Sequence, residues 1–185
     1  MEIKISTQQV LNVLKVIAWI IFIGLCIDAG GLIVNSFITL FVNSQAVNNF
    51  WIDSEYFSEL LSFDRGNFIV IAILMIIVAV LKSIMFYLIV KLFSENQLNF
   101  MQPFSVPLRQ FIKNLVYLSL AIGIFSFYGM RYTDWLSSKG MSEANLQELN
   151  IAGADVWLFM AVILFVIVQI VKRGIEIQTE NELTV

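Results

Sequence analysis

Charged residues are widely spaced along this chain and leave four long apolar runs between them, at about residues 16–41, 68–90, 113–131 and 155–172. A helix needs about 20 mostly apolar residues to cross a bilayer. The runs do not alternate apolar with polar residues, as the strands of a membrane barrel would. The pattern predicts an all-α integral membrane protein, a single domain over residues 1–185 with four transmembrane helices and a tail at 173–185.

The loops between the first and second runs and between the third and fourth runs are too long for simple turns. In residues 51–63 the apolar side chains are at helical spacing, which predicts a short interfacial helix along the membrane surface. These side chains are Tyr56, Phe57, Leu60 and Leu61. In residues 142–150 we expect a second short helix, with Ser142 as its N-cap and Leu146 and Leu149 on one face.

Composition supports a membrane protein and argues against most chemistry. Hydrophobic residues make up 59% of the chain and charged residues 14%, whereas a soluble domain is about one quarter charged. Cys26 is the single cysteine and histidine is absent, so the commonest general base and metal ligand are missing. We therefore expect no metal, no cofactor and no enzymatic activity. The net charge of -3 argues against direct nucleic-acid binding.

The distribution of charge predicts the orientation in the membrane. The first segment, the loop between the second and third runs, and the tail carry most of the bases: Lys4, Lys15, Lys91, Arg109, Lys113, Lys172 and Arg173. The other two loops carry most of the acids: Asp53, Glu55, Glu59, Asp64, Asp134, Glu143, Glu148 and Asp155. The positive-inside rule then places both termini in the cytoplasm of a bacterial inner-membrane protein.

Asp28 and Lys82 are the two charges inside the apolar runs. At 1.5 Å per residue they lie about 20 Å and about 14 Å from the inner interface, so their side chains could form an ion pair. An intramembrane ionisable group suggests a switch or a transport role. The alternatives are a structural pair that fixes helix register, or two separate groups with Lys82 extending towards the inner interface.

Small residues lie along two of the predicted helices. Gly24 and Gly31 share a side of the first with Asp28, and Ser119, Gly123 and Ser126 form a stripe in the third. Small residues let helices approach closely, so we interpret both groups as packing positions rather than as a polar permeation path.

The tail begins Lys172-Arg173-Gly174 and then becomes acidic. Gly174 permits a helix break after the basic pair. One interpretation is a mobile, solvated chain end. The other is a peptide that docks on a cytoplasmic partner by adding a strand.

This tail resembles the C-terminal signature of the YoaS-like family of four-pass bacterial membrane proteins, a domain of unknown function. The matching residues are Arg173, Gly174, Glu176, Gln178, Glu180, Asn181, Leu183, Thr184 and Val185. Ile177, Thr179 and Glu182 depart from the signature. A second match is the segment Pro103-Phe104-Ser105, which precedes the third run.

The resemblance implies a non-enzymatic protein that works with a small helix-turn-helix regulator encoded beside it. It implies that Pro103, Phe104 and the matching tail residues bind this partner. Both segments are predicted to be cytoplasmic, where such a regulator would be found. The alternative is a small oligomeric transporter or channel that uses Asp28 and Lys82, and a homo-oligomer is left open.

Overall fold

The computed structural model describes residues 7–50, 54–94 and 104–182. In this part the chain is helical and forms no strand. The helices are α1 (Thr7–Phe41), η1 (Ser44–Asn49), α2 (Ser54–Phe63), α3 (Arg65–Ser94), α4 (Val106–Ser138) and α5 (Ala154–Glu182). Each predicted run lies within one of α1, α3, α4 and α5, and each of these helices is apolar and long enough to cross a membrane. The predicted all-α membrane fold with four spans is confirmed.

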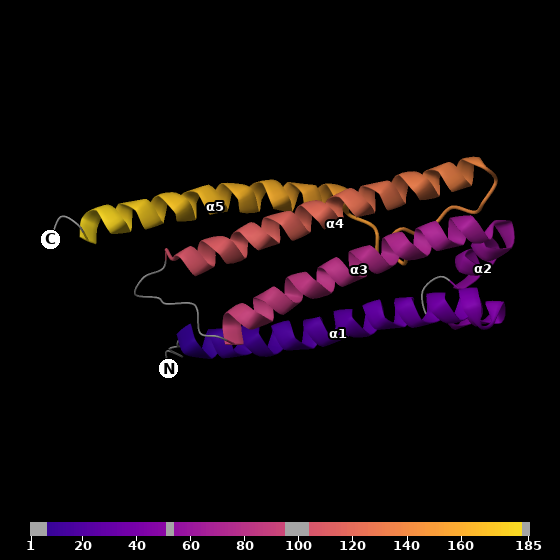
Figure 1. Cartoon of the computed structure of the whole chain (residues 1–185), viewed down its shortest axis with the longest axis horizontal. Helices are drawn as coiled ribbons and strands as arrows, with labels where there is room; N and C mark the ends of the chain where they lie inside the picture. The colour runs from indigo at the N-terminus through magenta and orange to yellow at the C-terminus, as the bar shows by residue number, and fades with distance from the viewer. Residues whose placement is uncertain (1–6, 51–53, 95–103, 183–185) are drawn as a thin grey trace, which may run out of the picture.

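The four long helices lie antiparallel in the order α1, α3, α4, α5, as Figure 1 shows. In the described part of the chain, α1 packs on α3, α3 on α4, and α4 on α5, while α1 contacts neither α4 nor α5. We call the end where α1 begins and α5 ends the terminal end. The opposite end, where η1 and α2 lie, is the loop end. The result is an open row of helices, so α1 is exposed along most of its length.

A compact aromatic cluster forms at the loop end. The Phe57 ring stacks on Phe50 at 4.7 Å between centroids and meets the edge of Phe68 at 5.8 Å. Phe57, Phe68 and Leu60 are fully buried. The apolar face of α2 is therefore part of the protein core. The position of this helix along the membrane surface stays a prediction. Its helical periodicity was predicted correctly.

Segment 141–153 also differs from its prediction. Residues 142–145 have no regular structure and residues 146–150 form turns, so this segment is not a helix and Ser142 is not an N-cap. The Ser142 side chain and its backbone N–H both donate hydrogen bonds to the Glu59 carboxylate on α2. Leu149 and Ile151 are fully buried. The segment thus folds back into the core of the protein.

Small residues of α4 pack closely against its neighbouring helices, with Ser119 beside Met85 of α3 and Gly123 beside Leu158 of α5. Ser119 and Ser126 are fully buried, and a Cβ atom at Gly123 would lie 2.8 Å from Leu158 Cδ2. The packing role predicted for the α4 stripe is confirmed, because a side chain at Gly123 would collide with α5. Gly24 in α1 differs, since a Cβ atom there would meet no atom within 4 Å. Gly24 therefore makes no close helix contact with the described part of the chain.

Candidate functional site

The start of α4 sets the position of Phe104. Ser105 is the N-cap of α4 and accepts a hydrogen bond from the Leu108 N–H at 3.3 Å. Pro107 lies in the first turn, where its missing N–H is tolerated. Ser105 has an extended backbone, so the chain approaches α4 from the side. This entry brings Phe104 against α5.

Phe104 packs directly on Gly174 of α5. A Cβ atom at position 174 would lie 2.5 Å from Cγ of Phe104 and 2.7 Å from Cδ1. Real Cβ contacts are essentially never that short, so the ring occupies the space that any larger side chain at 174 would need. The two segments that matched the family signature, far apart in the sequence, therefore meet at the terminal end.

Gly174 does not end α5, which continues to Glu182. The predicted helix break is wrong, because the glycine makes room for Phe104 within an unbroken helix. Local pairs support the helix here. The Glu176 carboxylate forms ion pairs with Arg173, at 3.0 Å between Oε2 and Nη1, and with Lys172, at 3.8 Å between Oε1 and Nζ. These pairs have the i,i+3 and i,i+4 spacings of neighbours on a helix.

The remaining candidate docking residues fall into two groups. Gln178, Glu180 and Asn181 lie on the helical extension of α5, with Glu180 and Asn181 exposed. Pro103, Leu183 and Thr184 lie outside the described residues.

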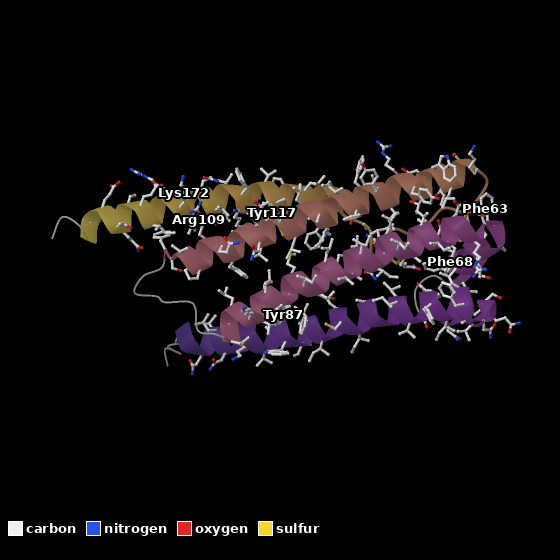
Figure 2. The ribbon with its side chains drawn as sticks, in the orientation of Figure 1. Phe63, Phe68, Tyr87, Arg109, Tyr117 and Lys172 are labelled. Atoms are coloured by element: carbon white, nitrogen blue, oxygen red, sulfur yellow. The ribbon has the colours of Figure 1, made fainter. Side chains whose placement is uncertain are left out.

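Basic residues gather at the terminal end. Figure 2 shows Arg109 of α4 and Lys172 of α5 far from Phe63 and Phe68 at the loop end. The terminal end thus combines an aromatic ring, an extended helix and mixed charge.

The structure does not bring Asp28 and Lys82 together. The rings of Phe22 and Tyr87 are 6.0 Å apart, and Arg65 donates to the Leu40 carbonyl. These two contacts fix the alignment of α1 with α3. Along the helix axes, Asp28 then lies within about one helical turn of Lys82. Among the described residues, no ion pair joins Asp28 to Lys82.

Lys82 is instead held by the end of segment 141–153. Its ammonium donates a hydrogen bond to the Asn150 carbonyl at 2.8 Å and lies 5.9 Å from the centre of the Trp157 ring. Side chains on a helix lean towards its N-terminus, which for α3 is at the loop end. Lys82 therefore extends towards the loop end, opposite to the inward direction considered from the sequence.

Sequence reasoning missed the polar contacts of segment 141–153. Asn150 has a positive φ of 56° and Gly153 one of 78°. Asparagine and glycine tolerate this left-handed conformation better than other residues. Their proximity in the sequence was the available signal for a tight turn, and that turn presents the Asn150 carbonyl to Lys82.

The contact between Glu59 and Ser142 predicts a pH effect. The hydrogen bonds from Ser142 hold the pKa of the Glu59 carboxyl below its ordinary value of 4.5. A lowered pKa stabilises the folded protein above the ordinary value, and this contribution is lost as the pH falls through the lowered pKa. The thermal midpoint of the wild type should therefore fall more steeply below about pH 4.5 than that of Glu59→Gln. Parallel pH profiles for the two proteins would contradict this.

Four antiparallel apolar helices, each long enough to cross a bilayer, define a multi-pass membrane protein. Within that class, a family model described as Protein of unknown function (DUF2975) matches residues 55–185, so the chain belongs to that family. The match includes Lys82, Phe104 and the whole of α5, and excludes α1. No curated protein and no solved structure matches the chain. The narrower YoaS-like assignment stays a prediction.

Proposed function

We propose that this protein is a non-enzymatic membrane partner that binds or restrains a cytoplasmic helix-turn-helix transcriptional regulator. The contact between Phe104 and Gly174 is the observation that carries the proposal. The contact joins the segment before α4 to the end of α5 in one surface. We call this the terminal surface, and it consists of Phe104 and residues 173–181. Two separate sequence signatures thus become parts of a single docking site.

The chemistry of the terminal surface suits a folded protein partner. Phe104 is 37% exposed and Ile177 is 45% exposed, which offers an apolar centre. Lys172, Arg173 and Glu180 are exposed on the same helix and supply a charged rim. Because α5 stays helical to Glu182, the partner would meet a helix, and strand addition has no support. By the positive-inside rule this surface faces the cytoplasm.

A pull-down from detergent-solubilised membranes tests the proposal. The probe is the helix-turn-helix protein encoded by the neighbouring gene, added in purified form. Deleting residues 174–185 should abolish its capture and leave membrane insertion intact, because the apolar run 155–172 is retained. Capture by the truncated chain at the level of the full chain would remove the proposal.

A point variant gives a sharper test of the same contact. Gly174→Ala should reduce capture by about tenfold, because the added methyl group displaces the Phe104 ring from the terminal surface. Alanine favours a helix interior by about 1 kcal/mol over glycine, so α5 itself should not be lost. The matched control is Gly24→Ala, where the new methyl group meets no atom within 4 Å. Equal capture by the two variants would contradict a role for the contact.

The geometry gives the transporter alternative no specific support. That hypothesis depended on Asp28 and Lys82 acting as a pair. Lys82 donates a hydrogen bond to the Asn150 carbonyl and lies over the Trp157 ring. Asp28 lies on α1, which packs only against α3 among the long helices of the described chain. We therefore do not propose transport.

A further inference from the structure

A small cavity lies at the loop end, between the end of α1, the start of η1, α2 and the start of α3. Figure 1 shows α2 beside the end of α1 and the start of α3, at the end opposite to the terminal surface. The cavity has a volume of about 340 Å³, a size at which pockets hold small molecules. Its position makes it independent of the docking site proposed for a regulator.

Thr39 of α1 lines the cavity and carries an unsatisfied hydroxyl group. The residue is only 3% exposed, and its Oγ1 has no hydrogen-bond partner in the described part of the chain. A buried hydroxyl group without a partner costs free energy, and most buried polar side chains are hydrogen-bonded. Because Thr39 lines the cavity, a polar group bound there would be within reach of its hydroxyl group.

Arg65 supplies the positive charge of the cavity. It is the first residue of α3, lines the cavity, and donates a hydrogen bond to the Leu40 carbonyl of α1. A guanidinium has five N–H donors, so this bond to a neutral acceptor positions the group and leaves both donors and charge for a ligand. Arg65 forms no ion pair with the described part of the chain. The carboxylate of the preceding Asp64 accepts a hydrogen bond from the Asn67 N–H at 2.9 Å.

The other lining residues add hydrogen-bond donors and apolar walls. Asn43 Oδ1 accepts from the Gln45 N–H at 3.0 Å, which leaves the N–H groups of the Asn43 amide as donors. Ser44 adds a hydroxyl group, and Leu40 and Leu61 provide apolar walls. No acidic residue is among the lining residues of the described chain. Such a lining suits an oxyanion that is attached to a small apolar group.

We propose that this cavity binds a small monocarboxylate with an apolar chain. The carboxylate accepts paired hydrogen bonds from Arg65 and a further one from the Thr39 hydroxyl group. The chain packs on Leu40 and Leu61. One guanidinium balances one negative charge, and the acidic residues of the neighbouring α2 disfavour the second charge of a phosphate. A carboxylate therefore fits the charge of the cavity better than inorganic phosphate does.

Equilibrium dialysis of the full-length protein in phosphatidylcholine nanodiscs can measure this binding. The probe is isotope-labelled hexanoate, and empty nanodiscs are the blank. We expect saturable binding that unlabelled hexanoate displaces and hexylamine, which has the opposite charge, does not. Binding no greater than the blank would overturn the proposal.

Two competitors test the choice of a carboxylate. Inorganic phosphate should displace hexanoate poorly, and displacement as strong as that by unlabelled hexanoate would identify a general anion site and overturn the proposal. Replacing phosphatidylcholine by phosphatidylglycerol should leave hexanoate binding in place. Loss of binding in phosphatidylglycerol would identify a lipid headgroup as the occupant and overturn the proposal as well.

Replacing Arg65 locates the charge that the ligand meets. Arg65→Gln should weaken hexanoate binding at least about tenfold, because it removes the charge and the paired donors but keeps an N–H for the Leu40 carbonyl. The matched control is Arg131→Gln in α4, where the guanidinium lies 5.4 Å from the centre of the Phe127 ring and outside the cavity lining. The control should change binding less than twofold. Equal losses would indicate diffuse attraction to positive charge and refute a specific site.

Thr39→Val separates ligand binding from folding. Valine has the shape of threonine without the hydroxyl group, so the thermal midpoint should stay the same or rise, while hexanoate binding weakens about fivefold. The matched control is Ser36→Ala, about one turn earlier in α1. Ser36 Oγ is also buried without a partner in the described chain, but Ser36 does not line the cavity, so binding should change less than twofold. Wild-type binding by Thr39→Val, or an equal loss in both variants, would refute the proposed contact.

Discussion

Phe57→Ala is expected to lower the free energy of unfolding by about 3–5 kcal/mol, the usual cost of removing a fully buried phenylalanine. The ring is buried completely and packs against both Phe50 and Phe68. These rings join η1, α2 and α3, so the cavity would open where three elements meet. The lost interactions include ring–ring contacts, which contribute beyond the area that is buried.

The matched control for Phe57→Ala is Phe63→Ala in the same helix. Phe63 is 46% exposed, so its replacement should change the unfolding free energy by about 0.5 kcal/mol or less. Both variants can be measured by reversible unfolding in mixed micelles. If the apolar face of α2 contacted lipid instead of the protein core, the two substitutions would have similar small effects. A similar result for both would therefore refute the buried position of α2.

The case of α2 shows how far the sequence could determine the fold. Helical spacing of Tyr56, Phe57 and Leu60 identified the helix and its apolar face. Spacing alone cannot distinguish a face that contacts lipid from one that contacts protein, because both environments favour apolar side chains. The aromatic residues that cover this face, Phe50 and Phe68, come from other elements. Their positions depend on the tertiary fold.

The candidate site could be predicted only in part, because its contacts also depend on the tertiary fold. The sequence identified Phe104 and Gly174 as separate positions, and their contact required the antiparallel register of α4 and α5. Depth along the helices also placed Asp28 and Lys82 at nearly the same level. It could not show the direction in which the Lys82 side chain extends. That direction is set by the helix polarity of α3 and by the Asn150 carbonyl, which a turn brings into reach.

Ile151→Ala should have the second large effect, because Ile151 is fully buried and holds segment 141–153 in the core. We expect a loss of about 2–5 kcal/mol in the free energy of unfolding. The adjacent Asn150 carbonyl is bonded to Lys82, so loosening of Ile151 should also weaken this hydrogen bond. Hydrogen exchange at the backbone of 149–152 should become faster in the variant. Unchanged exchange would show that the segment is held without Ile151.

A double-mutant cycle with Gly129 can separate packing at Ile151 from a general loss of stability. A Cβ atom at Gly129 would lie 2.8 Å from Cδ1 of Ile151, so Gly129→Ala alone should destabilise the protein by about 1–3 kcal/mol. In the Ile151→Ala background the Cδ1 atom is absent, and the same substitution should have a much smaller cost. The two substitutions should therefore be non-additive by about 1 kcal/mol or more. Additive effects would mean that Ile151 does not pack against Gly129, and that another contact holds the segment beside Lys82.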